Sequence, residues 1–417
     1  MCSARSFAAV ALLLSGPVAT QDWPVFRGPS CQGIARGTPL PPRPTEQHVR
    51  WRVAVGAGHS SPVVVGERLY LTRMAAEPDK REVVCLDAST GAQRWAAPCA
   101  FQAHRQHRFN SSASATPAAD AEGVCVVWSS GAALEARAFH ADGKPNWHRR
   151  LGGFAAQHGS GASPILCAGL LVVANDNASD DSFLVALDRA TGKERWRVKR
   201  KKADSSTAYS CPVVVGSGPR APYLLFASTT HGLTAVAPQS GAVLWELDLA
   251  LKHRCVATPC LIGDTLFVSA GSGGGGKDAV LVRLPALPDQ QPKLQQRLRK
   301  VLPYVPCALA GAGEVLWVTD GGVACRVSVA DGAVRWQQRL GGSFFSSPVT
   351  DGKTVFVADR AGVLHSFPFA GREPEMARFD LGSPVFATPA IAHGRLYVRT
   401  AKELVCLGAA PRKARKL

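Results

Sequence analysis

Hydrophobic and polar residues alternate along most of this 417-residue chain in short runs that end in turn-forming residues. Residues 184–196, LVALDRATGKERW, show the pattern best: two alternating runs are joined by a turn with glycine, and the second run contains tryptophan. The pattern returns at residues 83–95, 139–147, 233–245 and 325–336. Alternation with period two predicts β-strands, and glycine in a short turn predicts a hairpin. Because an isolated hairpin is barely stable in water, each hairpin must belong to a larger sheet.

A second repeated feature is a small residue followed by proline at the start of an apolar run, as in SPVVV at residues 61–65. The prolines are Pro62, Pro117, Pro164, Pro212, Pro259, Pro306, Pro348 and Pro389, spaced 41 to 55 residues apart. Proline is tolerated at the first residue of a strand and rarely elsewhere in a sheet. Each period therefore holds a proline-led strand, a second strand and one hairpin. Four strands in each period of about 40 to 50 residues are typical of a β-propeller blade.

The two ends of the repeat are incomplete in complementary ways. Trp51 precedes the first proline and lies on a fourth strand without three strands before it, whereas residues 388–408 supply three strands without a fourth. The hairpin tryptophans, which we expect to pack between blades, are Trp51, Trp95, Trp147, Trp196, Trp245 and Trp336, with one degenerate blade near residue 290. We predict an all-β, eight-bladed β-propeller at residues 50–408, closed by an N-terminal strand that completes the C-terminal blade.

Residues 1–20 have the pattern of a secretory signal peptide, with Arg5, an apolar stretch and small residues near a cleavage point. We expect residues 21–49 to form a leader segment and residues 409–417 a basic tail. A secreted or periplasmic location follows from the signal peptide. No internal run reaches the roughly 18 apolar residues of a membrane-spanning helix, so we expect a protein without a transmembrane segment, and we expect a monomer.

Cysteine usage fits an exported protein with a large core. Removal of Cys2 leaves 11 of the 12 cysteines, and an odd number requires at least one free thiol. Cys85 and Cys406 fall at the same strand position in neighbouring blades, where sheets about 10 Å apart are too distant for a disulfide, so we predict small core residues. Pairing of Cys255 with Cys260 stays open. The chain has no Cys-x-x-Cys motif for haem or zinc.

The formal charge of +17, or +16 without Arg5, raises the alternative of a nucleic-acid partner. Basic residues are densest at residues 193–202, where they alternate with apolar residues along one outer strand. Charges on the solvent face of an edge strand also prevent aggregation, so nucleic acid is not the partner we expect. The run GSGGGGKD (271–278) is interpreted as a hairpin loop, because it joins two strands and has Asp278 where a phosphate-binding loop needs Ser or Thr.

Two groups of polar residues suit a metal but have structural explanations. Asp87 and Asp188 repeat at a turn position where a carboxylate accepts backbone N–H groups, which favours turn capping over metal binding or acid–base chemistry. Asn175, Asp176 and Asn177 offer oxygen ligands for calcium, but a polar inter-strand loop is the favoured interpretation.

The connections from the fourth strand of one blade to the first strand of the next share one face beside the channel. One connection is longer than the others, and its excess lies in residues 101–112, a sensible place for binding on a rigid scaffold. Two histidines in this loop suit a metal, although spare loop histidines are the favoured interpretation. The candidate binding face comprises His59, His104, His107, Asn110, His158, Tyr209, Arg254, Tyr304, Phe345 and Phe386. We assign no catalytic or metal-binding residue.

The repeated D-x-x-T-G-x-x-x-W hairpin, with Ser/Thr-Pro opening the next blade, resembles the quinoprotein-type (PQQ-like) β-propeller repeat over residues 50–408. The leader WPVFRGPSCQGIA (23–35), residues 159–166 and residues 394–408 resemble exported, uncharacterised members from planctomycete-type bacteria. The family also includes quinoprotein alcohol dehydrogenases and BamB-like propellers. The resemblance therefore implies the fold but leaves the activity open.

The dehydrogenases of this family hold PQQ with calcium, a catalytic aspartate and a disulfide between adjacent cysteines. This chain has no Cys-Cys pair. We favour an exported, non-catalytic binding or scaffold propeller without a cofactor, which takes a protein or cell-envelope ligand at the candidate face. A PQQ-dependent alcohol or sugar dehydrogenase, with PQQ and calcium, is the alternative.

Overall fold

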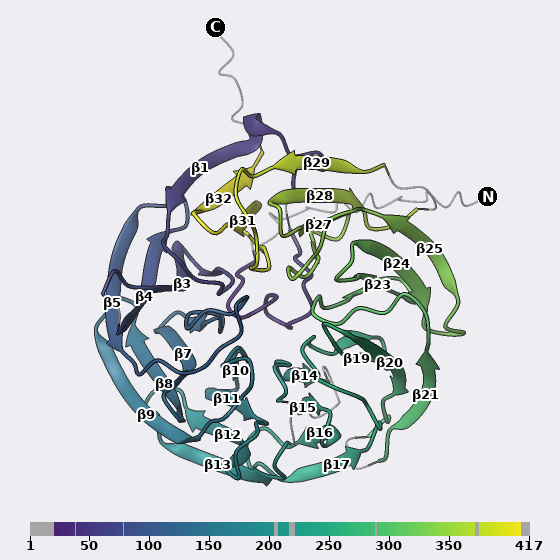
Figure 1. Ribbon diagram of the computed structural model, residues 1–417, viewed down its shortest axis with the longest axis horizontal. Coiled ribbons are helices and arrows are strands. Elements are labelled where there is room, and N and C mark those ends of the chain that lie inside the picture. Colours follow the sequence, from purple (N-terminus) through teal and green to yellow (C-terminus); the bar gives the residue numbers. More distant parts are fainter. Residues whose placement is uncertain are drawn as a thin grey trace, which may run out of the picture.

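A computed structural model describes residues 21–37, 39–77, 79–203, 207–216, 222–287, 290–371 and 375–409. The expected signal peptide and residues 410–417 of the expected basic tail lie outside these residues. Within the described chain, four-stranded antiparallel sheets form eight blades around a central channel (Figure 1). The predicted eight-bladed β-propeller is confirmed.

The strands of blades 1 to 7 run from the channel to the rim in chain order. Blade 1 contains β2 (Val63–Val65), β3 (Arg68–Met74), β4 (Lys80–Asp87) and β5 (Gln93–Ala100). Blade 2 contains β6 (Ala118–Asp120), β7 (Gly123–Ser130), β8 (Ala133–His140) and β9 (Pro145–Gly153). Blade 3 contains β10 (Ile165–Cys167), β11 (Leu170–Asn175), β12 (Ser182–Asp188) and β13 (Glu194–Arg200). Blade 4 contains β14 (Val213–Val215), β15 (Tyr223–Ser228), β16 (Gly232–Val236) and β17 (Val243–Leu247).

Blades 5 to 8 continue the ring. Blade 5 contains β18 (Cys260–Ile262), β19 (Thr265–Ser272), β20 (Gly275–Arg283) and β21 (Lys293–Leu298). Blade 6 contains β22 (Leu309–Ala310), β23 (Glu314–Val318), β24 (Val323–Ser328) and β25 (Val334–Arg339). Blade 7 contains β26 (Val349–Thr350), β27 (Thr354–Ala358), β28 (Val363–Pro368) and β29 (Ala377–Asp380). Blade 8 contains β30 (Ala390–Ala392), β31 (Arg395–Arg399), β32 (Glu403–Gly408) and β1 (Val49–Ala54), which follows the short helix η1 (Glu46–His48).

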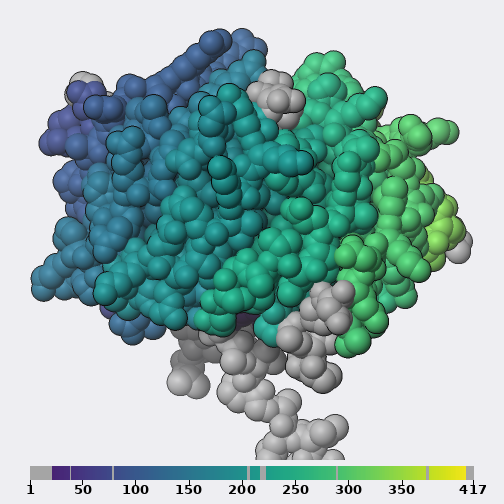
Figure 2. Space-filling view, turned by 90° about the horizontal axis from the view of Figure 1, so that it is seen from below, coloured from purple at the N-terminus to yellow at the C-terminus, as the bar shows by residue number. Residues whose placement is uncertain are grey.

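The N-terminal strand closes the ring as predicted. β1 pairs antiparallel with β32, and Trp51 lies opposite Cys406 while Val53 lies opposite Leu404. Strands β30 to β32 are therefore completed by a strand from the other end of the propeller. Seen from the side, the surface passes from blue through teal to green, so the blades follow one another around the ring in chain order (Figure 2).

Four outer-strand tryptophans, Trp51, Trp95, Trp147 and Trp196, face the glycine turn of the following blade. A Cβ atom on Gly143 would lie 2.7 Å from the ring of Trp95, and the indole Nε1 of Trp95 donates a hydrogen bond to the carbonyl of Ala141 at 3.0 Å. Blade 5 has no outer-strand tryptophan: Gln296 of β21 lies against Gly332 where six other blades place tryptophan, and β29 of blade 7 also lacks it. The glycine thus provides both a positive φ and room for the neighbouring side chain.

The small residue before the proline has a structural role that the sequence did not reveal. The N–H of Ser61 donates to Oγ1 of Thr116 at 3.0 Å, and the N–H of Thr116 donates to Oγ of Ser163 at 2.9 Å. The same contact links Thr258 to Cys307, Cys307 to Ser347, Ser347 to Thr388 and Thr388 to Ser61. These hydrogen bonds link six pairs of neighbouring blades around the channel, and we call them the hydrogen-bonded ring.

Blade 6 departs from the predicted register. β22 begins at Leu309, so Ala308 stands at the position that proline occupies in the other blades, and the prediction that Pro306 opens this strand is wrong by two residues. The physical reason is the hydrogen-bonded ring, which needs a side-chain acceptor. Val305 offers none, whereas Sγ of Cys307 accepts the N–H of Thr258 at 3.2 Å.

The predicted loop at residues 271–278 is shorter than expected. β19 continues to Ser272 and β20 begins at Gly275, so residues 273 and 274 form the turn. The described part of the chain has only free cysteines, including Cys255 and Cys260, and Cys85 and Cys406 are buried as predicted.

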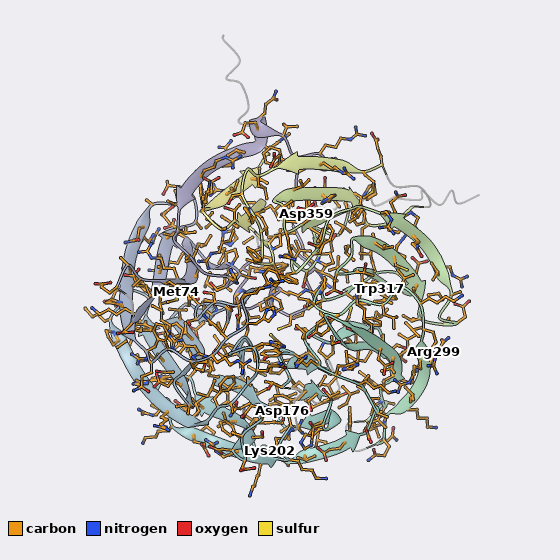
Figure 3. All side chains as sticks on the ribbon, viewed as in Figure 1. Met74, Asp176, Lys202, Arg299, Trp317 and Asp359 are labelled. Atoms are coloured by element: carbon orange, nitrogen blue, oxygen red, sulfur yellow. The ribbon has the colours of Figure 1, made fainter. Side chains whose placement is uncertain are left out.

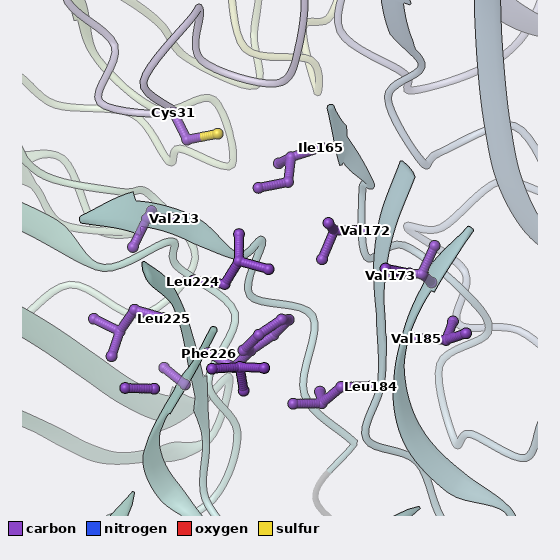
Figure 4. Close-up of a cluster of buried hydrophobic side chains, with 14 of the residues drawn as sticks. Cys31, Ile165, Val172, Val173, Leu184, Val185, Val213, Leu224, Leu225 and Phe226 are labelled. Carbon is purple, nitrogen blue, oxygen red and sulfur yellow. The ribbon is translucent and has the colours of Figure 1, made fainter. Parts of the chain in front are cut away.

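The described part of the leader segment before β1, residues 21–37 and 39–48, crosses one end of the channel, where its purple trace lies at the centre of the ring (Figure 1). It hydrogen-bonds to blade 1 through Trp23 and Val64, blade 2 through Pro24 and Ala119, blade 5 through Gln32 and Leu261, blade 6 through Arg27 and Ala308, and blade 7 through Gly33 and Thr350. Cys31 belongs to the same buried cluster as Ile165 and Val213 of blades 3 and 4 (Figure 4). The leader segment therefore joins blades that are far apart in the ring.

Side chains differ in exposure between the rim and the inside of the ring, and Asp176 and Asp359 are buried inside it (Figure 3). Lys202 and Arg299 lie toward the outer edge, whereas the fully buried Trp317 lies within the ring (Figure 3). Within the described residues, no helix has the length and apolar character needed to cross a membrane.

Candidate binding site at the channel mouth

The channel-mouth cavity, with a volume of about 840 Å³, lies at the end of the channel opposite the leader segment. All eight connections between blades contribute lining residues, and the hairpins between the second and third strands of blades 5 to 7 contribute more. Phe26 of the leader segment reaches the cavity from the other end. The volume lies within the range of about 300 to 1,000 Å³ that ligand sites usually have.

The structure brings most of the candidate residues together. His59, His107, Asn110, His158, Tyr209, Arg254, Tyr304, Phe345 and Phe386 all line the channel-mouth cavity. His104 is the exception: its Nε2 lies 2.8 Å from Oγ of Ser129, so its ring faces blade 2 and is not part of the lining.

The inserted loop, residues 101–112, is tied to blades on both sides. Arg81, buried in blade 1, donates a hydrogen bond to the carbonyl of Ser112 at 3.1 Å. Nδ2 of Asn110 donates to the carbonyl of His158 at 2.6 Å in the next connection. These anchors fix both the position and the direction of the loop.

The inserted loop crosses the cavity and completes an aromatic cluster. The ring of Phe109 meets that of Phe345, from the connection between blades 6 and 7, with centroids 5.6 Å apart. Phe345 lies 6.3 Å from Phe386, and Phe386 stacks on His59 at 4.5 Å. We call these four residues the aromatic cluster. Rings from four separate connections therefore pack into one surface.

Two guanidinium groups lie on this cluster. Cζ of Arg360, from the turn between β27 and β28, is 4.1 Å from the centroid of Phe109 and 4.7 Å from that of Phe345. Cζ of Arg108 is 4.7 Å from the same Phe109 centroid. Each position is within cation–π distance of the ring.

The other charged groups of the lining have partners. Nζ of Lys277 forms an ion pair with Asp320 at 2.9 Å, and Asp320 also accepts the N–H groups of Tyr304 and Val305. Arg254 donates a hydrogen bond to the side chain of Gln157. Lys277 and Asp320 cancel in charge, so the net positive charge of the lining comes from arginine.

Two histidines of the lining, His59 and His158, have lowered pKa values and favour the neutral form. Burial lowers the pKa of His59 to about 4, and the nearby Arg399 guanidinium lowers it too, while a hydrogen bond to the Phe109 backbone opposes the shift. Burial also lowers the pKa of His158, with Arg254 and His107 acting in the same direction. These two imidazoles are therefore uncharged at neutral pH and serve as packing and hydrogen-bonding groups.

The lining residues do not fit a calcium-held quinone. Calcium takes six to eight oxygen ligands, carboxylates above all. Among the described lining residues Asp320 is the one carboxylate, and its oxygens already bind Lys277 and two backbone N–H groups. Nowhere in the described ranges do three or more His, Cys, Asp or Glu side chains gather as metal ligands would.

The polar motifs outside the cavity have the structural roles that the sequence predicted. Oδ1 of Asp87 accepts the N–H groups of Ser89 at 2.8 Å and Thr90 at 3.0 Å, which caps the turn. Asp176 is buried against Arg200, with the Nε–Oδ1 distance at 2.9 Å, inside a hydrogen-bonded inter-strand loop.

Sequence reasoning missed four lining residues that matter for the chemistry: Phe26, Arg108, Phe109 and Arg360. Arg108 and Phe109 lie in the inserted loop that the spacing identified. The position of Arg360 could have been predicted from the strand order, because the turn between the second and third strands of a blade lies at the same end as the connections between blades. The position of Phe26 could not have been predicted, because the leader segment is not part of the repeat and the repeat does not determine its path.

Comparisons with known proteins agree with the fold. The family model described as outer membrane protein assembly factor BamB matches residues 44–232, 112–285, 294–371 and 327–410. No curated protein matches the sequence. BamB from Moraxella catarrhalis superposes with a TM-score of 0.55 and 14% identity, over 88% of this chain and 100% of that chain.

Two dehydrogenases have the same fold. Quinohemoprotein alcohol dehydrogenase from Comamonas testosteroni superposes with a TM-score of 0.63 and 14% identity, over 95% of this chain and 82% of that chain. A europium-containing methanol dehydrogenase superposes with a TM-score of 0.55 and 11% identity, over 85% of this chain and 90% of that chain. At these identities the likenesses show the fold alone, and function has to be argued from the site.

Proposed function

This chain belongs to the family described as outer membrane protein assembly factor BamB, and from that premise we propose that it is an exported, non-catalytic propeller that binds a partner protein at the channel-mouth cavity. The observation that carries the proposal is the convergence of loops from all eight blades on one cavity, whose wall includes the cluster of phenylalanine and histidine rings with arginine on it. Aromatic residues and arginine supply much of the binding energy of protein interfaces.

The arrangement of titratable groups supports a non-catalytic role. A general base or an activated nucleophile needs a partner within hydrogen-bond reach and a group that orients it. The rings of His107 and His158 stand edge to face with centroids 5.0 Å apart, and the one carboxylate of the described lining, Asp320, is held by Lys277. Binding requires only the shape and polarity of the lining.

A variant that fills the cavity tests the proposal. A Cβ atom added at Gly161 would lie 3.5 Å from the ring of Tyr209, an ordinary contact, so Gly161→Leu fills space without a backbone clash. Ala155→Leu, at an exposed position of the same connection, is the matched control. Peptides selected on the purified protein from a phage-displayed library of random twelve-residue peptides should bind the control and lose affinity for Gly161→Leu. Equal affinity for both variants would place binding elsewhere and contradict the proposal.

The dehydrogenase alternative has its own test. PQQ and calcium are added to purified protein, and dye-linked oxidation of alcohols and sugars is measured beside the thermal midpoint. We expect neither turnover nor a shift. A ligand present at 100 times its Kd adds about 2.7 kcal/mol of stability, which a thermal shift detects.

Export rests on residues 1–20 and is tested separately. Mass spectrometry of the mature protein should find an N-terminus near Gln21, whose side-chain oxygen accepts the N–H of Arg36 at 2.8 Å. An intact Met1 would contradict export through this segment.

A further inference from the structure

Arg108 and Arg360 form a pair of like charges on a shared aromatic ring. Their Cζ atoms lie 4.7 Å and 4.1 Å from the centroid of Phe109, and they come from the inserted loop and from blade 7. Neither guanidinium has a carboxylate partner among the described residues. Two cations on one ring repel each other, so this arrangement favours an anion from outside the chain.

Arg360 adds a more specific observation. Its Nε is buried and has no hydrogen-bond partner within the described chain. Most buried side-chain donors are hydrogen-bonded, and each exception needs an explanation. Phe109, Phe345 and Phe386 surround the guanidinium at 4.1, 4.7 and 5.9 Å, which holds its plane in place without using its N–H donors.

The remaining charges do not supply the missing anion. Asp320 is the carboxylate of the described lining, and it binds Lys277 and two backbone N–H groups. His59 and His158 are neutral at pH 7 because burial lowers their pKa values. The cavity therefore combines an unneutralised pair of guanidinium groups with a wide apolar and aromatic wall.

We propose that the channel-mouth cavity recognises an acidic peptide segment, with a carboxylate bound by the guanidinium groups beside Phe109, those of Arg108 and Arg360, and an adjacent aromatic or aliphatic side chain packed on the aromatic cluster. This inference rests on the proposed function and names the chemistry of its partner. Guanidinium and carboxylate groups match in planar, bidentate geometry, and the phenylalanine rings lower the local polarity and strengthen the pair. The carboxylate comes from an Asp or Glu side chain or from the C-terminus of the partner.

Matched substitutions separate the two arginines from general charge effects. Arg108→Gln and Arg360→Gln each remove one guanidinium of the pair. Arg105→Gln is the control, because Arg105 lies in the same inserted loop, is exposed and does not line the cavity. Thermal melts of all three variants establish that the fold is retained.

The probe is the set of peptides selected from the phage-displayed library on the unmodified protein. We expect the selected sequences to carry Asp or Glu next to an aromatic or aliphatic residue. Synthetic versions should lose about 10- to 100-fold in affinity when the acidic residue is replaced by its amide, and by a similar factor with Arg108→Gln or Arg360→Gln, since a hydrogen bond to a charged group is lost. Arg105→Gln should leave the affinity unchanged.

A second pair of peptides identifies the source of the carboxylate. A peptide whose only carboxylate is its C-terminus is compared with its C-terminal amide, and both are compared with the peptide that bears the acidic side chain. A loss on amidation assigns recognition to the terminus, and a loss on replacement of the side chain assigns it to the acidic residue. Either loss supports the inference.

Failure of this inference differs from failure of the proposed function. Peptides that lose binding with Gly161→Leu, but not with Arg108→Gln, Arg360→Gln or removal of their carboxylates, would overturn anion recognition and leave the cavity as the binding site. Peptides that bind Gly161→Leu unchanged would overturn both.

Discussion

The two ends of the channel each hold an arginine, and the two side chains differ in what satisfies them. Arg27 of the leader segment is completely buried, and its Nη2 donates to the carbonyls of Ala308 at 2.6 Å and Gln32 at 3.0 Å. Arg360 at the channel mouth is partly exposed, and its guanidinium contacts phenylalanine rings. Nη2 of Arg27 binds carbonyls of its own chain although its Nε and Nη1 have no partner, whereas the guanidinium of Arg360 makes no hydrogen bond to the described residues.

This difference separates two ends of the channel. The end that the leader segment covers, the closed end, stabilises the fold, and the channel mouth, the open end, is available for binding. At the closed end, hydrogen bonds and apolar contacts of the leader segment link blades that are not neighbours, so substitutions there should cost stability. At the open end, the connections present side chains whose loss leaves the blades intact. Substitutions there should cost binding and little stability, because surface positions usually change it by less than about 0.5 kcal/mol.

The largest effect should come from opening the ring on which both ends depend. A chain truncated after Ala401 lacks β32, which pairs with both β1 and β31, and should lose cooperative unfolding. A chain truncated after Ala409 keeps every described strand and is the control. The test is urea unfolding monitored by tryptophan fluorescence and circular dichroism. Similar transitions for both truncated chains would contradict closure as the source of stability.

A matched pair of aromatic substitutions compares the two ends directly. Trp23→Ala removes a fully buried ring that packs against Gly28, and should lower the free energy of unfolding by about 3 to 5 kcal/mol. Phe109→Ala removes a partly exposed ring of the aromatic cluster and should cost about 1 kcal/mol while weakening peptide binding. Chemical denaturation and binding titration of both variants measure the difference. Equal losses of stability would remove the distinction between the ends.

Lowering the pH should reduce the free energy of unfolding, because His59 at the channel mouth is held in its neutral form in the folded protein. In the unfolded chain His59 takes up a proton near its ordinary pKa of 6.5, whereas in the folded chain burial and Arg399 lower the pKa to about 4. Between these values the unfolded state binds more protons, so stability is full above pH 6.5 and falls as the pH drops. The loss reaches up to about 3 kcal/mol at pH 4.

The variant His59→Gln should flatten this part of the pH profile. His59 faces Arg399 of β31, stacks on Phe386 and hydrogen-bonds to the Phe109 backbone, and the variant keeps a polar side chain there. His140→Gln, at an exposed turn of blade 2, is the substitution control. Thermal and urea unfolding from pH 4 to pH 8 measure the slopes. An unchanged slope in His59→Gln would assign the acid sensitivity to other groups.

Each hydrogen bond of the hydrogen-bonded ring should contribute less to the free energy of unfolding than the buried side chain of Trp23 does. Thr388→Val keeps the shape of the side chain but removes the oxygen that accepts the N–H of Ser347 at 3.0 Å, and should cost about 1 to 3 kcal/mol. Thr191→Val, on an exposed turn, should cost about 0.5 kcal/mol. Denaturant midpoints compare the two variants. A smaller loss in Thr388→Val than in Thr191→Val would show that the ring adds no stability.

The smallest effect on stability should follow Arg360→Gln. Removal of one of two repelling guanidinium groups should change the free energy of unfolding by less than about 0.5 kcal/mol. Arg27→Gln is the counterpart at the closed end, and it should cost more because it leaves the carbonyl of Ala308 without its donor. A greater loss in Arg360→Gln would mean that this side chain supports the fold and would weaken its assignment to binding.

Local sequence patterns predicted the blades because every blade packs against its neighbours in a similar way. Alternation, turn glycines and outer-strand tryptophans recur in most blades, so the sequence identified Trp95 and Gly143 as parts of the same repeated contact. The same logic failed in blade 6. There the spacing of Pro306 suggested a strand start, but the hydrogen-bonded ring required the acceptor of Cys307, and the strand begins at Leu309.

The candidate site could be predicted only in outline. Topology places all connections between blades at one end, which brought nine candidate residues to one cavity. It could not show that His104 turns toward Ser129, nor that the inserted loop crosses the channel to bring Phe109 against Phe345. Those outcomes depend on anchors such as Arg81, whose partners are backbone carbonyls and leave no trace in sequence spacing.

The sequence by itself determined the number of blades, their strand order and the closure by the Trp51 strand, because these follow from periodic local preferences that add around a ring. The tertiary structure alone decided the path of the leader segment and the pairing of Arg108 with Arg360 on Phe109. These features join residues hundreds of positions apart through single, unrepeated contacts. A repeat constrains what every blade shares, and a site is built from what the blades do not share.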